Sequence, residues 1–217
     1  MCADCVTRPA GPAEHAYRRL MPSPLRDESP GFHHVWCRGN NKRSIVIDDR
    51  DRLTLLSLIG SVAVQYDWRI AAYCVMDNHY HLVIEIGENG MGRGFCRINT
   101  AHATRFNKRH GRINHLFGRR YGSNPLPDPA SLVNACRYVL RNPVEAGVVE
   151  RPEDYHWSSH SATMGLANGH VPLATSELLS TFDRDLRRAR VAFADFVSTA
   201  TSAELAELRE AASVTRV

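Results

Sequence analysis

His79 and His81 lie two residues apart at the head of a short apolar run that ends before Gly87. A run of this length, rich in branched residues, predicts a β-strand over residues 79–86. Strand side chains alternate between the two faces, so both imidazoles point the same way and can share one metal ion. Carboxylate or amide oxygens from elsewhere in the fold would complete the site. Taken alone, such a pair is more often two half-exposed strand histidines than a metal site.

Tyr138 and Asn142 lie four residues apart in a segment that predicts a helix over residues 130–142, so they share one face of it. A tyrosine hydroxyl close to a bound metal ion can attack a phosphodiester, and the amide of Asn142 offers an oxygen ligand from the same face. The product would be a phosphotyrosine, which stores bond energy for a later strand-joining step. The alternatives from the residues alone are a structural tyrosine and an asparagine that ends the helix before Pro143.

Positive charge is concentrated in the middle of the chain. Residues 89–127 contain no Asp or Glu, although the net charge of the whole chain is only +4. The same stretch contains the basic residues Arg93, Arg97, Arg105, Lys108, Arg109, Arg112, Arg119 and Arg120. A segment of one charge sign creates a positive surface, and its commonest polyanionic partner is nucleic acid. The alternative is a solvated basic helix on the protein surface.

The composition predicts a single domain with extensions. A chain of 217 residues with 43% hydrophobic residues can bury a full core. Its apolar stretches all fall short of the roughly 18 residues that a membrane span needs. The N-terminus lacks a basic segment followed by an apolar one, so no signal peptide is expected. These features predict a cytoplasmic protein without a membrane partner.

The cysteines give little sign of a metal site. Cys2 and Cys5 form a C-x-x-C pair, but the chain has no second pair that would complete a zinc ribbon. A disordered tail is the simpler interpretation of that pair. The other four cysteines lie in apolar or periodic segments and are expected to be small buried residues.

Hydrophobic periodicity and turn residues divide the chain into elements. Strands are expected over residues 32–38, 68–75 and 79–86, and helices over residues 48–66, 91–109 and 130–142. Residues 121–129 contain three prolines and are expected to form a loop, with any flanking strand short. This order predicts an α+β fold, an antiparallel β-sheet with helices on one face. Two more helices are expected after Thr175, with breaks near Asp183 and residues 199–201.

Six sequence blocks occur in a characteristic order between about residues 24 and 165. They are residues 36–41 (WCRGNN), 72–82 (AYCVMDNHYHL), 105–112 (RFNKRHGR), 115–117 (HLF), 136–138 with 141–147 (CRY and RNPVEAG), and 155–159 (YHWSS). With these blocks the chain resembles the REP-associated tyrosine transposases, which are single-tyrosine HUH transposases. The resemblance implies a ferredoxin-like or RRM-like HUH domain over residues 30–165. The arm over residues 1–29 is rich in Pro, Ala and Arg without periodicity and is expected to be flexible. Residues 166–217 are expected to form a helical C-terminal extension.

The resemblance also implies roles for the residues described first. His79 and His81 match the metal-binding pair, Tyr138 matches the nucleophile, and Asn142 falls where such enzymes carry a third polar ligand. The family is expected to cut single-stranded DNA beside a hairpin with Mg²⁺ or Mn²⁺, through a 5′-phosphotyrosine bond. The DNA would be a repetitive palindromic element of a bacterial genome, and the enzyme a monomer or a homodimer.

The residues expected to contact DNA combine the basic segment with the turn after the first strand. They are Arg38, Asn40, Arg93, Arg97, Arg105, Lys108, Arg109, Arg112, Arg119, Arg120 and Tyr121. Tyr121 lies beside two arginines, so a phosphate contact or base stacking suits it better than nucleophilic attack.

Two departures from the family pattern affect these expectations. Asp77 stands where the family often has Pro, and it is expected to be a turn residue rather than a carboxylate beside the metal. The second departure is the three-proline loop, which replaces an apolar β segment of the family. Glu85, which shares the strand face of the histidines, is expected at the sheet edge.

Two rival functions remain: a hairpin-binding protein without catalysis, and a metal-dependent phosphodiesterase that uses water.

Overall fold

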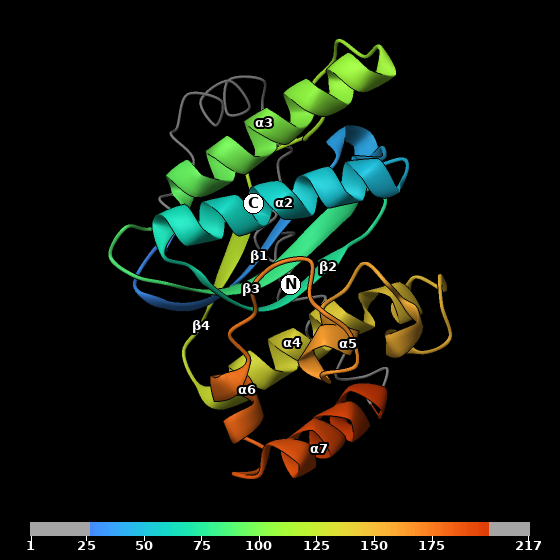
Figure 1. The fold of residues 1–217 in the computed structure, drawn as a ribbon. Helices are drawn as coiled ribbons and strands as arrows, with labels where there is room; N and C mark the ends of the chain where they lie inside the picture. Colours follow the sequence, from blue (N-terminus) through green and yellow to red (C-terminus); the bar gives the residue numbers. More distant parts are fainter. Residues whose placement is uncertain (1–26, 200–217) are drawn as a thin grey trace, which may run out of the picture.

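The computed structural model of the chain describes residues 27–199 (Figure 1). Its strands are β1 (Gly31–Arg38), β2 (Arg69–Val75), β3 (His79–Ile86) and β4 (Gly122–Leu126). Its longer helices are α2 (Asp49–Tyr66), α3 (Gly92–His110), α4 (Pro129–Glu145) and α7 (Leu186–Ser198). Short helical turns lie between them: η1 (Asn40–Lys42), η2 (Pro152–Asp154), α5 (His160–Thr163) and α6 (Ser176–Ser180).

The four strands form one antiparallel sheet in the order β2–β3–β1–β4, which confirms the predicted α+β fold. β1 pairs with β3, where Trp36 lies opposite His81, and on its other side with β4. The prediction of a loop over residues 121–129 is partly wrong, because β4 lies within these residues. Pro125 is compatible with β4 because an edge strand leaves one row of its backbone groups without a partner strand.

Helices cover both faces of the sheet, α2 and α3 on one face and α4 on the other (Figure 1). Along β3, Tyr80 and Leu82 enter the core shared with α2 and α3, whereas Val83 enters the core shared with α4. The expectation of helices on one face is therefore wrong. The sequence contains a signal for two-sided coverage in β2, whose residues 70–75 form an unbroken apolar run and are all buried. A strand that is covered on both faces is apolar at successive positions.

α2 and α3 form the layer on one face. α2 is capped by Asp48, which accepts a hydrogen bond from the backbone N–H of Asp51 at 3.1 Å. α3 packs closely because Gly94 has no side chain, and a Cβ atom there would lie 2.4 Å from the ring of Trp68. That ring stacks on Phe95 with centroids 5.0 Å apart. A larger residue than glycine would push the two helices apart at this point.

α4 crosses the opposite face above β2 and β3. Its N-cap is Asp128, which accepts a hydrogen bond from the backbone N–H of Ser131 at 2.8 Å. The helix continues past its expected end at residue 142 and includes Pro143 in its last turn. A proline so close to the C-terminal end of a helix removes only one hydrogen bond and leaves the turns before it intact.

The C-terminal helices α6 and α7 lie on the outer side of α4 (Figure 1). Phe193 of α7 is fully buried in the same hydrophobic cluster as Val139 of α4. The break expected near Asp183 is confirmed, because α6 ends before it and α7 begins after it. This part of the chain therefore shares a core with the sheet.

Several predictions concern residues outside the described part. They are the Cys2–Cys5 pair, most of the arm over residues 1–29, and the chain beyond residue 199. Of the other four cysteines, three are buried as expected, but Cys96 on α3 is exposed. Within residues 27–199, every helix is too short or too polar to cross a membrane.

Candidate active site

His79 and His81 lie side by side on the face of β3 that α4 covers. Their ring centroids are 5.0 Å apart and the rings are perpendicular. His81 is buried, and His79 is partly buried at the start of the strand. Because β3 is paired on both sides, by β1 and β2, the backbone that carries both rings is held rigidly.

Tyr138 and Asn142 approach the two histidines from α4, one helical turn apart. The phenol ring of Tyr138 meets the ring of His81 edge-on, with centroids 5.5 Å apart. Oδ1 of Asn142 lies 3.0 Å from Nε2 of His79. The fold therefore brings together the four residues that the sequence suggests as nucleophile and metal ligands.

A third histidine, His34 of β1, joins the group and is absent from the residues predicted by sequence. Its Nε2 lies 2.9 Å from Nδ1 of His81, and its ring meets that of Tyr138 edge-on at 5.5 Å. Trp36 lies opposite His81 in the strand pairing, so His34 is the next residue on that face of β1. A strand over residues 32–38 is visible in the sequence, but the register that brings it to β3 is not.

Burial keeps this histidine cluster (His34, His79 and His81) neutral. It lowers the pKa of His34 and of His79 to about 4, and it lowers the pKa of His81 well below its usual value. At His79 the contact with Asn142 opposes this pKa shift, and the charge of Arg38 adds to it. A neutral imidazole has a free lone pair, which metal ligation requires.

One pair of donor atoms has the spacing of neighbouring metal ligands. Nε2 of His79 and Oδ1 of Asn142 are 3.0 Å apart. Neighbouring ligands of an octahedral ion such as Mg²⁺, each about 2.1 Å from the metal, are separated by roughly 3 Å. Within residues 27–199, no three His, Cys, Asp or Glu side chains are grouped so as to hold a metal ion. The amide of Asn142 is a further oxygen donor beside His79.

Basic residues at the end of the sheet that carries His79 come from two segments that lie side by side. Arg38 ends β1 directly opposite His79 in the strand pairing. The chain around Arg38 is hydrogen-bonded to the backbone of residues 116–118. Arg119 and Arg120 come next in the chain and are exposed. The backbone of these three arginines thus lies near the end of the sheet that carries His79.

The basic residues of α3 belong to the helical layer on the other face of the sheet (Figure 1). The exposed ones are Arg93, Arg97, Arg105, Lys108 and Arg109. Arg97 donates to the side chain of Gln65 near the end of α2 at 2.6 Å. The other half of α3 reaches the chain beside His79, since His102 contacts the carbonyl of Ile45, whose N–H donates to the carbonyl of Asp77. Arg105 and Lys108 are therefore nearer to the candidate site than Arg93 and Arg97.

Asn40 and Arg112 lie in the loops between these segments. The backbone N–H of Asn40 donates to the carbonyl of Leu116 at 2.8 Å. Arg112 lies over the ring of Phe106 and donates to the carbonyl of Ser44 at 3.5 Å. Asn40 is thus a loop residue beside Arg38, and Arg112 is anchored on α3.

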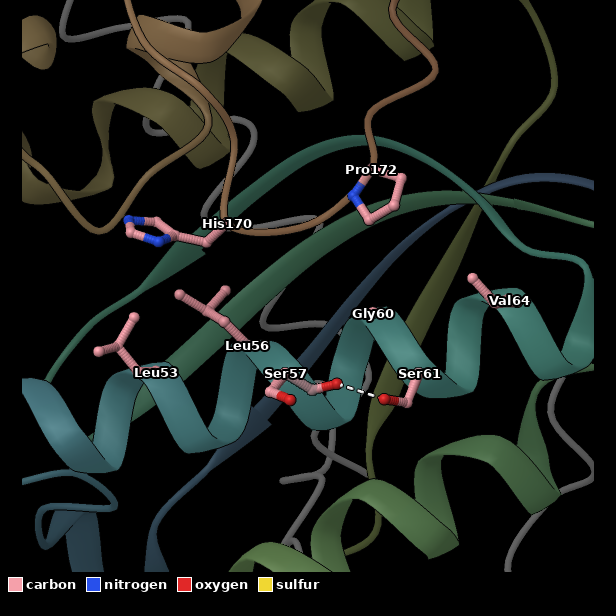
Figure 2. Close-up of a pocket in the computed structure, with 8 residues that line it drawn as sticks. All are labelled: Leu53, Leu56, Ser57, Gly60, Ser61, Val64, His170 and Pro172. Carbon is pink, nitrogen blue, oxygen red and sulfur yellow. Dashed lines mark hydrogen bonds between the residues drawn. The ribbon is translucent and has the colours of Figure 1, made fainter.

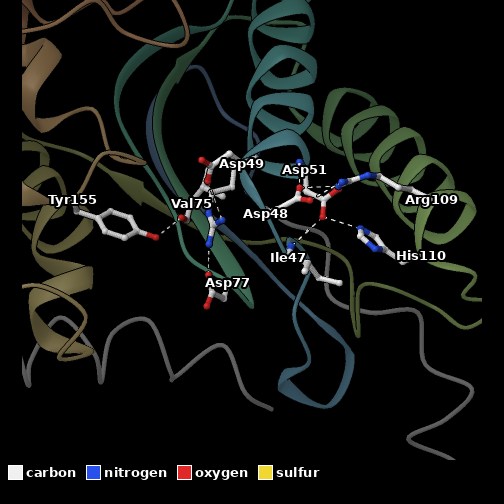
Figure 3. A network of polar contacts seen from close by, with 10 residues as sticks. Ile47, Asp48, Asp49, Asp51, Val75, Asp77, Arg109, His110 and Tyr155 are labelled. Carbon is white, nitrogen blue, oxygen red and sulfur yellow. Dashed lines mark hydrogen bonds and ion pairs between the residues drawn. The ribbon is translucent and has the colours of Figure 1, made fainter.

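Arg109 is paired with acidic residues of α2 (Figure 3). Its guanidinium donates to Asp48 at 2.7 Å and to Asp51 at 2.6 Å, and His110 contacts Asp51 at 2.9 Å. These bonds raise the pKa of Arg109 and lower the pKa of Asp48. The charge of Arg109 joins the end of α3 to the start of α2, and its DNA contact stays a prediction.

The DNA contact predicted for Tyr121 is wrong, because Tyr121 lies in the core. It is 5% exposed, and its ring stacks on Phe95 with centroids 4.8 Å apart. Its hydroxyl donates to the carboxylate of Glu28, which also accepts the backbone N–H groups of Met91 and Gly92. The predicted base stacking or phosphate contact would need an exposed ring or hydroxyl, so Tyr121 is a packing residue.

The two carboxylates near the histidines in sequence are engaged elsewhere. Asp77 lies in the turn between β2 and β3, as expected, and forms an ion pair with Arg52 of α2 (Figure 3). Glu85 forms an ion pair with Arg69 on the neighbouring strand β2. Both carboxylates therefore stabilise the fold outside the histidine cluster.

A separate hollow of about 690 Å³ lies along the exposed side of α2 (Figure 2). Its lining consists of Leu53, Leu56, Ser57, Gly60, Ser61, Val64, His170 and Pro172. Because α2 covers the face of the sheet opposite to α4, this hollow is distinct from the histidine cluster.

Comparison with known proteins connects this geometry to a family. Residues 29–142, just over half of the chain, match the family model described as Transposase IS200 like. A Haemophilus influenzae protein assigned as a REP-associated tyrosine transposase is 25% identical over 134 residues, which cover 54% of this chain and 76% of that protein. A solved structure of a REP-associated tyrosine transposase bound to a REP hairpin has a similar fold, with a TM-score of 0.56 at 18% identity over 72% of this chain and 94% of that one. The chain belongs to the IS200-like transposase family.

Proposed function

We propose that this protein is a single-stranded DNA endonuclease and strand-transferase that cuts beside DNA hairpins with Tyr138 as the nucleophile. The observation that carries the proposal is the meeting of α4 with β3. There Tyr138 contacts His81 with ring centroids 5.5 Å apart, and Asn142 lies 3.0 Å from His79. A hydroxyl nucleophile beside a set of metal-ligating side chains suits phosphodiester cleavage. Membership of a transposase family supports DNA as the substrate.

In the proposed cleavage, the phenol oxygen of Tyr138 attacks the scissile phosphorus. A new O–P bond joins the tyrosine to the 5′ phosphate of the downstream fragment, and the bond from phosphorus to the 3′ oxygen of the upstream fragment breaks. The phenol loses one proton and the departing 3′ oxygen gains one. A different 3′ hydroxyl then reverses the exchange, which joins two strands without an external energy source.

His79, His81 and Asn142 would hold Mg²⁺ or Mn²⁺. When bound, such an ion polarises the scissile phosphate and stabilises the negative charge that develops on it. The protein supplies neutral ligands, since burial lowers the pKa of His79 to about 4. Because α4 carries both Asn142 and Tyr138, one rigid element sets the spacing between a ligand and the nucleophile.

The DNA backbone is proposed to cross the end of the sheet that carries His79. Arg38, Arg119 and Arg120 would neutralise phosphates there, and Arg105 and Lys108 would extend the positive surface. The remaining proposed contacts, further from the cluster or partly engaged within the protein, are Asn40, Arg93, Arg97, Arg109 and Arg112. The likeness to a transposase bound to a REP hairpin supports hairpin DNA with a single-stranded flank as the substrate to test.

The test is covalent capture of labelled DNA. A hairpin with a single-stranded flank from the surrounding genome is incubated with Mn²⁺ or Mg²⁺ and separated on a denaturing gel. Wild type is expected to give a slowly migrating protein–DNA adduct, which Tyr138→Phe and His79→Ala should both lose. Tyr66→Phe is the matched control, because Tyr66 packs on Trp68 in the α2 layer and should leave the adduct unchanged.

Other outcomes would support the rival functions. Cleavage that survives Tyr138→Phe would assign the reaction to water or to another tyrosine. Tight hairpin binding without cleavage by wild type would favour a hairpin-binding protein that has lost catalysis. The convergence of Tyr138, Asn142 and the histidine cluster favours the enzyme over both rivals.

A further inference from the structure

Each ring nitrogen of His79 faces an amide oxygen. Nδ1 lies 2.6 Å from Oδ1 of Asn78, and Nε2 lies 3.0 Å from Oδ1 of Asn142. A neutral imidazole carries one N–H group, so it can donate to only one of these oxygens. The choice between them decides whether Nε2 keeps a lone pair on the side of Asn142.

The amide of Asn78 is fixed by the loop after β1. Its Nδ2 donates to the carbonyl of Lys42 at 3.1 Å. A carbonyl can only accept, so the nitrogen of the amide faces Lys42 and the oxygen faces His79. The backbone carbonyl of Asn78 accepts the N–H of Gly39 at 2.8 Å, which ties the same residue to the loop a second time.

The loop that holds Asn78 has an uncommon backbone. Asn41 and Lys42 both have left-handed conformations, with φ of 52° and 60°. Such conformations are unfavourable for residues other than glycine and persist where the surroundings enforce them. Gly39 permits the tight return of the chain, because a Cβ atom there would lie 2.0 Å from the carbonyl oxygen of Arg43. This backbone presents the Lys42 carbonyl to Asn78.

We propose that Asn78 is a positioning residue that holds His79 with its proton on Nδ1 and its lone pair on Nε2. Asn78 has the shorter contact and an amide orientation fixed by Lys42. Without Asn78, the remaining side-chain acceptor beside His79 is Oδ1 of Asn142. The ring proton then moves to Nε2, where it blocks metal ligation. Partners of this kind orient metal-ligating histidines and set their tautomers. The inference rests on the proposed function in one respect, that Nε2 is the metal-binding atom.

The test reads the tautomer directly and without metal. Two-bond ¹H–¹⁵N spectra of protein labelled with ¹⁵N-histidine distinguish Nδ1–H from Nε2–H rings. Wild type is expected to show His79 with Nδ1–H, and Asn78→Ala is expected to show Nε2–H. Asn78→Asp loses the donor to the Lys42 carbonyl but keeps an oxygen for Nδ1–H, so it should restore the wild-type tautomer if that oxygen is what sets it. Asn107→Ala is the matched control, since Asn107 also donates to a loop carbonyl, that of Asn114 at 2.9 Å.

Mn²⁺ binding, measured by electron paramagnetic resonance with the metal alone, gives a second readout. Asn78→Ala is expected to weaken binding by about 10- to 100-fold, whereas Asn78→Asp and Asn107→Ala should bind as wild type does. An Nε2–H ring in wild type, or an Nδ1–H ring in Asn78→Ala, would overturn the inference. The wild-type tautomer decides this even where Asn78→Ala does not fold. A wild type that forms no DNA adduct would instead contradict the proposed function and leave the tautomer result standing.

Discussion

Buried imidazoles need hydrogen-bond partners, and the histidine cluster finds them within itself and in the amides on either side. His34 contacts His81, and His79 lies between Asn78 and Asn142. Burial depresses the pKa of all three histidines, so the polar atoms of the cluster stay available as neutral donors and acceptors. The chemistry proposed for Tyr138 depends on this neutral set of ligands.

Asn142 gives the first prediction at the scale of single residues. Asn142→Ala removes the amide oxygen beside Nε2 of His79, so Mn²⁺ affinity should fall by about tenfold. Asn142→Asp restores an oxygen ligand and should recover the affinity. Asn134→Ala, a change on the same helix where the amide contacts Arg137, is the control. Equal Mn²⁺ affinity in Asn142→Ala and wild type, measured by calorimetry, would exclude Asn142 as a ligand.

The sequence predicts some of these residues and not others, for a physical reason. The spacing of His79 with His81, and of Tyr138 with Asn142, is local, so alternation and helical periodicity place each pair on one face. The position of His34 depends on the register between β1 and β3, which a single sequence does not reveal. The pairing of Arg109 with Asp48 likewise joins residues about 60 positions apart.

At the scale of elements, the candidate site depends on α4 crossing the face of the sheet opposite to α2 and α3 (Figure 1). The strands and long helices follow from periodicity and caps, as Asp48 and Asp128 illustrate. The missed strand β4 contains Pro125, whose type argues against a strand unless its edge position is known. Edge position is a property of the assembled sheet and not of the segment.

His102 ties α3 to the loop before α2 and makes stability depend on pH. Its Nε2 contacts the carbonyl of Ile45 at 2.8 Å, and burial lowers its pKa. As the pH falls below about 6.5, the unfolded chain takes up the proton before the folded one, so the folded state loses stability. His102→Gln does not titrate, so its melting temperature should fall less than that of wild type between pH 7 and pH 5. The exposed His115→Gln should follow wild type, and identical slopes for all three would contradict this role.

At the scale of the whole molecule, the C-terminal helices belong to the same folding unit as the sheet. Phe193 is fully buried between α7 and the rest of the cluster around α4. Phe193→Ala should lower the free energy of unfolding by about 3–5 kcal/mol, in a single urea transition. Val191→Ala, on the exposed side of α7, should change it by less than about 0.5 kcal/mol. Two separate transitions would show that α7 folds independently.

Charge distribution over the whole molecule predicts how salt affects DNA binding. Arg119 and Arg120 are exposed beside Arg38 at the end of the sheet that carries His79. Replacing either Arg119 or Arg120 by Ala should reduce the slope of log affinity against log salt by about one. Arg188→Ala removes an exposed charge on α7 that pairs with Asp183, and it should leave the slope unchanged. Fluorescence anisotropy with a labelled hairpin measures all three slopes, and equal slopes would place the DNA elsewhere.

Mass spectrometry can show whether Tyr138 itself becomes bonded to DNA. Tryptic peptides are prepared from the trapped adduct after nuclease digestion of the DNA. We expect a nucleotide phosphate on Tyr138, with all other tyrosine peptides unmodified. A nucleotide on a different tyrosine, or cleaved DNA with no modified peptide, would exclude Tyr138 as the nucleophile.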